Sequence, residues 1–142
     1  MARELLLIAV VAACGRDKPA TPPVTGTVPL ASKAFYRIDA GPQTPCASGT
    51  TCEARFALTA LGVYHVNTQY PFKLVGDPAP AMALDGDGTF VLDDAKHGTM
   101  TVKFRPRAPG TAKLIGTFKL SVCTEEVCEI ETPKVELAVP VS

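Results

Sequence analysis

A long run of alternating apolar and polar residues, from 111 to 122, constrains the fold of this chain more than any other feature. The apolar members on one side of the run are Leu114, Phe118, Leu120 and Val122. Successive side chains of a β-strand point to opposite faces, so a period of two predicts a strand with one buried face. No segment carries a convincing apolar stripe at helical spacing. We therefore expect the core to be made of strands.

Similar runs recur along the chain. Residues 53–61 and 99–105 alternate cleanly, and their apolar sides are formed by Phe56, Leu58, Ala60, Met100, Val102 and Phe104. Further strands are expected at residues 33–39, 64–67, 70–75, 88–92 and 127–139. Strands at this spacing, separated by turns rich in proline and glycine, predict an all-β, antiparallel β-sandwich. The 13 prolines are compatible with that fold, because edge strands and turns accept proline.

The N-terminus predicts export. Arg3 precedes an apolar run over residues 5–13, which is shorter than the roughly 20 residues of a membrane-spanning helix and typical of a secretory signal. The run ends in Val11-Ala12-Ala13-Cys14, which resembles the bacterial lipobox. The resemblance implies that the signal, residues 1–13, is cleaved before Cys14 and that the Cys14 thiol is lipidated. The alternative is an ordinary signal peptide in which this cysteine has no role.

Residues 14–32 are rich in proline, threonine and alanine, a composition that favours extended conformations. We expect this segment to be a flexible tether between the membrane and a sandwich domain at residues 33–142. Gly15 stands where an aspartate often directs lipoproteins of enterobacteria to the inner membrane. The expected location is therefore the bacterial cell envelope, at the outer membrane and facing the periplasm.

Charge and motifs exclude several classes of function. Acidic and basic residues number 14 each and form no run, so the chain lacks the basic patch of a nucleic-acid-binding protein. Asp85 and Asp87 begin a calcium-like loop, but Lys96 occupies its last ligand position, and a hairpin turn explains the segment better. His65 and His97 are the only histidines; His65 lies on an apolar strand and His97 beside a glycine in a loop, and a copper or zinc site shared with the cysteines is the minor alternative. We expect no metal site, no cofactor and no nucleic-acid partner.

The cysteines predict disulfides. Cys46, Cys52, Cys123 and Cys128 make an even number in a domain expected to be exported. Pairing each cysteine with its neighbour in sequence is the preferred connectivity. Cys46 and Cys52 enclose a short loop just before a strand, which indicates a structural disulfide.

Cys123 and Cys128 leave two interpretations open. If residues 124–127 turn a hairpin, the two Cα atoms lie about 4.5–5.5 Å apart, within disulfide range. The loop is so short that the bond stabilises the fold by only about 2 kcal/mol. Glu125, Glu126 and Glu129 are expected to raise the pKa of a nearby thiol, which argues against a reactive thiolate. The local chemistry thus favours a structural disulfide over a redox pair.

Residues 110–138 resemble the end of the N-terminal periplasmic domain of DsbD, and residues 64–67 and 70–71 are similar to an upstream segment of that family. The resemblance implies an immunoglobulin-like sandwich and a redox role for Cys123 and Cys128, with Cys128 as the cysteine that first attacks or is attacked. In that family the pair passes electrons between a membrane partner and thioredoxin-like proteins. Residues 129–131 depart from the pattern, which has an aromatic residue or leucine and prolines there.

Two functions therefore follow from the sequence. The first is a lipid-anchored envelope protein whose sandwich is a binding or structural module, with another envelope protein as its partner. The second is a thiol–disulfide exchange module that uses Cys123 and Cys128 on a thioredoxin-like partner. The first is not enzymatic, and the two differ in the reduction potential of the pair.

Overall fold

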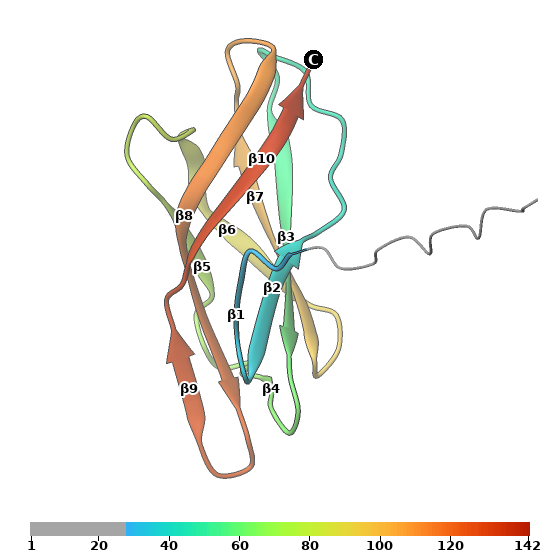
Figure 1. Ribbon diagram of the computed structural model, residues 1–142, viewed down its shortest axis with the longest axis vertical. Coiled ribbons are helices and arrows are strands. Elements are labelled where there is room, and N and C mark those ends of the chain that lie inside the picture. The colour runs from blue at the N-terminus through green and yellow to red at the C-terminus, as the bar shows by residue number, and fades with distance from the viewer. Residues whose placement is uncertain (1–27) are drawn as a thin grey trace, which may run out of the picture.

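The computed structural model describes residues 28–142, which form ten β-strands and, within that range, no helix (Figure 1). The all-β prediction is confirmed. The strands pair antiparallel in two sheets that pack face to face. The predicted signal, Cys14 and most of the predicted tether lie outside the described residues.

The first sheet contains five strands. In spatial order they are β1 (Ala31–Lys33), β2 (Tyr36–Ala40), β3 (Cys52–Ala60), β7 (His97–Phe104) and β6 (Leu84–Leu92). Alternate residues of β3 are buried without exception, as its sequence predicts.

The second sheet is organised around β8 (Gly110–Cys123), the longest strand. Along one edge it pairs with β10 (Lys134–Val141) and then with β9 (Cys128–Glu131). Along the other edge it pairs with β5 (Lys73–Gly76) and then with β4 (His65–Val66). One strand therefore holds four partners, and its last residues are paired on both sides.

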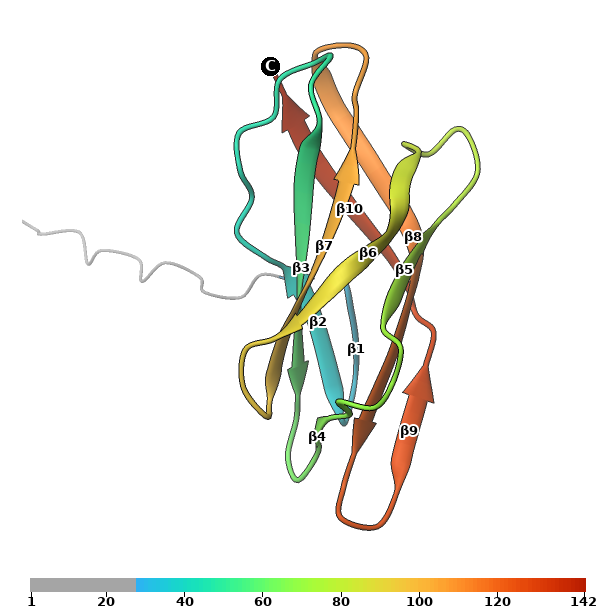
Figure 2. The same ribbon diagram turned by 180° about the vertical axis from the view of Figure 1, so that it is seen from behind.

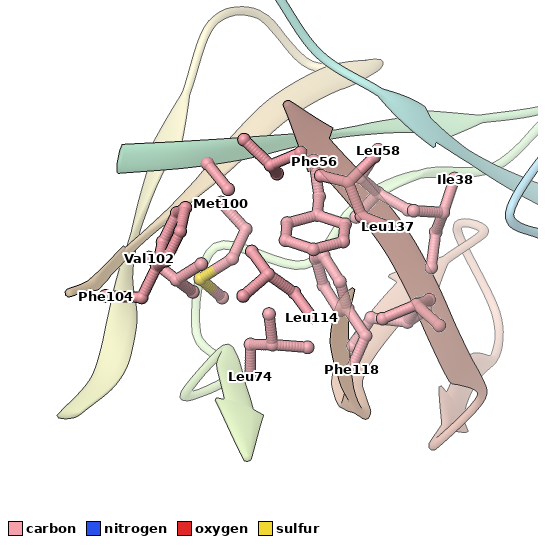
Figure 3. Packing of buried hydrophobic residues seen from close by; sticks show 14 of the residues in the cluster. Ile38, Phe56, Leu58, Leu74, Met100, Val102, Phe104, Leu114, Phe118 and Leu137 are labelled. Carbon is pink, nitrogen blue, oxygen red and sulfur yellow. The ribbon is translucent and has the colours of Figure 1, made fainter. Parts of the chain in front are cut away.

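The core lies between the two sheets and contains the apolar residues that the alternation selected (Figure 3). Phe56 of β3 and Phe118 of β8 meet edge to face, with ring centroids 6.5 Å apart. Both are 0% exposed, as is Met100. Aromatic pairs of this geometry contribute beyond their buried area, so this contact helps to fix one sheet on the other.

The predicted strand at residues 127–139 is interrupted. β9 and β10 keep one register against β8, since Glu131 is opposite Leu120 and Lys134 is opposite Thr117. Between them, Pro133 still accepts a hydrogen bond from the Phe118 N–H at 2.9 Å. Proline has no N–H to donate in return, so the ladder breaks there and resumes beyond it.

The prediction of a hairpin turn at Asp85 and Asp87 was wrong. Both residues lie inside β6, where the pairing with β7 shifts register between Asp85 and Thr89. Gly88 has a φ of +82°, which glycine adopts without cost, and an added Cβ would lie 2.6 Å from the sulfur of Met100. The segment is therefore a bulge, and the turn follows β6 instead.

Candidate functional site

The Cys123–Cys128 disulfide closes the tip of the β8–β9 hairpin, which forms one end of the molecule in Figure 2. The two cysteines are directly opposed in the ladder, with Cα atoms 4.0 Å apart. The Thr124 N–H donates to the Val127 carbonyl at 2.7 Å, and the Thr124 hydroxyl accepts from the Val127 N–H at 3.1 Å. The expected four-residue turn is present, and hydrogen bonds as well as the disulfide close it.

The two cysteines of this pair differ in exposure. Cys123 is only 5% exposed, because it lies in the middle strand with β4 on one side and β9 on the other. Cys128 is exposed at the start of β9. A thiolate arriving from solvent therefore reaches the pair from the Cys128 side.

The glutamates near the pair do not all share its face. Glu129 and Glu131 alternate with Cys128 along β9 and face the first sheet, where the Glu131 carboxylate lies 2.7 Å from the Lys33 ammonium. That hydrogen bond, with added attraction from Glu129, raises the pKa of Lys33 above its ordinary value. Glu129 therefore lies on the opposite face of β9 from Cys128, because the pleat of the strand turns its side chain away.

The sequence placed His65 on an apolar strand and linked it to the cysteines only through the minor alternative of a shared metal site. In the ladder it is directly opposite Cys123, on the edge of β8 away from Cys128. Its neighbour Val66 is buried in the core opposite Val122, so His65 and Cys123 share the outer face. No local sequence pattern reveals this juxtaposition, because the two strands come from different halves of the chain.

β4 is also held by polar contacts beside the cysteines. The Asn67 N–H donates to the Ser121 carbonyl at 3.0 Å, and the Asn67 amide donates to the Ser121 hydroxyl at 3.2 Å. Ser121 is fully buried. A buried hydroxyl that is hydrogen-bonded costs little, so this pair fixes β4 against β8 next to Cys123.

Apolar side chains surround the hairpin tip. Val63, Val127 and Ile130 are 80%, 49% and 63% exposed. Val63 also lines a shallow hollow with Thr124 and the turn glutamates. We call these three residues, with Cys128, the tip surface. Exposed apolar groups that cluster on one surface are typical of a protein-binding site.

The Cys46–Cys52 disulfide lies at the opposite end of the molecule. Both cysteines are buried, at 4% and 5% exposed, and their Cα atoms are 5.4 Å apart. The loop that they close is tied to the C-terminus, because the Ser142 N–H donates to the Cys46 carbonyl and the Ser48 N–H donates to the Ser142 carbonyl, each at 2.9 Å. This pair has the setting expected of a structural disulfide.

The other histidine belongs to the first sheet, where it is opposite Thr59 of β3. His97 begins β7, and its ring nitrogen lies 2.8 Å from the Asp94 carboxylate. A backbone hydrogen bond from Lys96, helped by His97, lowers the pKa of Asp94. Across residues 28–142, no three His, Cys, Asp or Glu side chains gather so that they could hold a metal ion.

Comparisons with known proteins found no matching family model, no matching curated protein and no matching solved structure. In the part of the chain that the structure describes, no helix has the length and apolar character needed to cross a membrane.

Proposed function

We propose that this protein is a lipid-anchored component of the bacterial cell envelope that exchanges disulfides with a partner protein through Cys123 and Cys128. The observation that carries the proposal is the difference in exposure within the pair: Cys128 is exposed while Cys123 is 5% exposed. Exchange requires attack on one sulfur and departure of the other, and a pair with one accessible sulfur gives that reaction a direction. The tip surface offers the partner an apolar contact around Cys128.

The exchange balances with a dithiol partner. A partner thiolate attacks the Sγ of Cys128, the S–S bond breaks, and its electron pair goes to the Sγ of Cys123. A second thiolate of the partner then attacks the partner's own sulfur in the mixed disulfide and releases Cys128. Two protons taken up by the leaving sulfurs complete a dithiol here and a disulfide on the partner. The two hydrogen bonds between Thr124 and Val127 keep the hairpin closed while the S–S bond is open.

The proposal accords with the resemblance to the N-terminal domain of DsbD. That resemblance supplies the immunoglobulin-like type of sandwich, the attack at Cys128 and a thioredoxin-like protein as the partner. The lipobox-like residues that end in Cys14 supply the membrane anchor, and Gly15 favours the outer membrane, facing the periplasm.

The test is the redox equilibrium of the pair in the full chain carrying Cys14→Ser. We expect the Cys123–Cys128 pair to equilibrate with glutathione buffers, at a potential above the roughly −300 mV typical of structural disulfides. The Cys46–Cys52 pair is the internal reference and should stay oxidised. A Cys123→Ser variant, which leaves Cys128 as the free thiol, should form a mixed disulfide with the oxidised, disulfide form of a thioredoxin-like protein. A potential below the glutathione range for both pairs would remove the exchange function.

The second candidate function is a binding module in which both disulfides are structural. The exposed apolar residues of the tip surface favour it, since they contact a partner whether or not sulfur chemistry follows. Replacing both Cys123 and Cys128 by serine separates the two functions. Partner binding that survives this double change, measured by titration calorimetry, would support the binding module if the unchanged chain also exchanges no disulfide with that partner.

The lipid anchor has its own test. Cys14→Ser should either release the protein in soluble form or leave the signal uncleaved, and the mass of the product should lack the acyl chains. An acylated product from the Cys14→Ser chain would contradict the lipoprotein assignment.

A further inference from the structure

His65 lies in one cross-strand row with the Cys123–Cys128 disulfide. The β4–β8 register sets His65 directly opposite Cys123, and the β8–β9 register sets Cys128 opposite the same residue from the other edge. Directly opposed residues of antiparallel neighbours have Cβ atoms about 4.5–5.5 Å apart on one face. An imidazole and the two sulfur atoms therefore share one face of three adjacent strands.

His65 lies beside Cys123, the more buried cysteine of the pair. Cys123 is 5% exposed, whereas His65 is half-buried and keeps contact with water. A thiolate in so dry a position is unfavourable unless a cation or a hydrogen-bond donor lies against it. A protonated imidazole supplies both, and it also exchanges its proton with solvent.

The carboxylates near these strands do not share the position of His65 opposite Cys123. Glu125 and Glu126 are exposed in the turn beyond the disulfide. Glu129 faces the first sheet together with Glu131, which is paired with Lys33. The next residue of β9 on the same face as Cys128 is Ile130, which is apolar.

The nearby cations are also engaged or further along the strands. Lys96, on the turn between β6 and β7, donates to the carbonyls of Gly62 and Tyr64, just before β4. Lys119 is the next basic residue on the outer face of β8, two alternations away from Cys123, and it is opposite Lys73. Of these groups, His65 alone is level with the cysteines.

We propose that His65 is the proton partner of Cys123 in disulfide exchange. This inference rests on the proposed exchange function and names a residue that raises the rate of exchange. When an external thiolate attacks Cys128, the S–S electron pair moves to the Cys123 sulfur, and protonated His65 stabilises or protonates that leaving group. In the reverse direction, neutral His65 accepts the proton of the Cys123 thiol, and the thiolate attacks the mixed disulfide on Cys128. A leaving thiol of lower pKa departs faster, so His65 accelerates both directions.

The experiment compares His65→Gln with His97→Gln in the full chain carrying Cys14→Ser. His97 is the matched control, because it is the other histidine and lies on the β6–β7 hairpin. The first readout is the rate of reduction by glutathione from pH 5 to pH 8, corrected for the glutathione thiolate present. The second is the pKa of the Cys123 thiol in a Cys128→Ser background, followed by thiolate absorbance.

We expect His65→Gln to slow reduction about tenfold near pH 6 and to raise the pKa of Cys123 by about one unit, the equivalent change. His97→Gln should match the unchanged chain in both readouts. His65→Lys, which carries a charge across this pH range, should keep the fast rate and lose its pH dependence. Circular dichroism and an intact Cys46–Cys52 pair verify that each variant folds.

The outcomes separate this inference from the exchange function. If Cys123–Cys128 equilibrates with glutathione but His65→Gln and His97→Gln give the same pH profile, the role of His65 is refuted and exchange stands. If the pair has a potential below the glutathione range, both proposals fail together.

Discussion

The two disulfides close loops of nearly equal length, with sequence separations of 6 and 5, yet they lie in opposite settings. Cys46 and Cys52 are both buried, and their loop is hydrogen-bonded to the end of β10, so the bond ties β3 of one sheet to the C-terminus of the other. Cys123 and Cys128 join neighbouring strands that a hydrogen-bonded turn already holds together. The sequence spacing is almost the same in the two pairs. They differ in exposure and in whether hydrogen bonds already hold the bridged segments together.

Loop length therefore says little about the role of a short disulfide. Loop-closure entropy assigns about 2 kcal/mol to either bond. What separates them is whether the surrounding structure depends on the bond and whether a thiol can reach it.

Replacing both Cys46 and Cys52 by alanine should lower the free energy of unfolding by about 3–4 kcal/mol. Lost loop closure accounts for about 2 kcal/mol, and the space left by two buried sulfur atoms accounts for the rest. Urea unfolding of the full chain carrying Cys14→Ser measures the change. A loss under 1 kcal/mol would show that the hydrogen bonds from Ser48 and Ser142 hold this end without the disulfide.

Glutathione should reduce the Cys123–Cys128 pair roughly 100-fold faster than the Cys46–Cys52 pair, since the buried pair must wait for local opening. Alkylation with iodoacetamide at timed intervals, followed by peptide mass analysis, gives both rates in one sample. Equal rates would abolish the distinction between the two disulfides.

Replacing both Cys123 and Cys128 by alanine should cost about 2–3 kcal/mol, the entropy of the loop and the space left by the one buried sulfur of Cys123, because the turn keeps its hydrogen bonds. The same urea experiment measures it. A cost equal to or above that of the Cys46 and Cys52 double change would assign a structural role to the hairpin disulfide.

The Lys33–Glu131 pair, which joins β1 to the hairpin, should have the smallest effect. The hydrogen bond to Glu131 raises the pKa of Lys33 in the folded state above the ordinary value of 10.5. The pair therefore stabilises the fold at neutral pH and up to that value, and the contribution is lost as the pH rises through the raised folded pKa. The difference in urea midpoint between the unchanged chain and Lys33→Met should be small at pH 7 and vanish above that pKa. A difference that persists there would assign the effect to packing of the lysine stem.

Most of the fold could be predicted because strand period and burial are local properties. Alternation in residues 53–61, 99–105 and 111–122 correctly selected the inward faces, and adjacent spacing gave the disulfide pairing that the structure contains. The errors concern backbone events that composition does not determine. Pro133 interrupts a ladder whose register continues, and Gly88 belongs to a bulge where the same residue types also suit a turn.

The site was predicted only in part for a similar reason. Cys123 and Cys128 are neighbours in sequence, so their opposition follows from a hairpin. The position of His65 depends on β4 pairing with β8, two strands separated by three others along the chain. The face that the Glu129 side chain occupies was predictable, because Glu129 follows Cys128 directly in β9 and successive residues of a strand point to opposite faces.

The four ladders of β8 also have a consequence for the order in which the chain folds. β9 and β10 follow β8 directly in the chain. Two strands of the other sheet, β6 and β7, lie between β8 and the earlier strands β4 and β5. Contacts between distant segments carry a larger loop-closure cost and form later. Pulsed hydrogen exchange should therefore show the β8–β9–β10 amides protected before those of β4. The hairpin then brings Cys123 and Cys128 together while the other edge of β8 is still open to water. On that timetable the chain oxidises its cysteines first and acquires the neighbouring histidine afterwards.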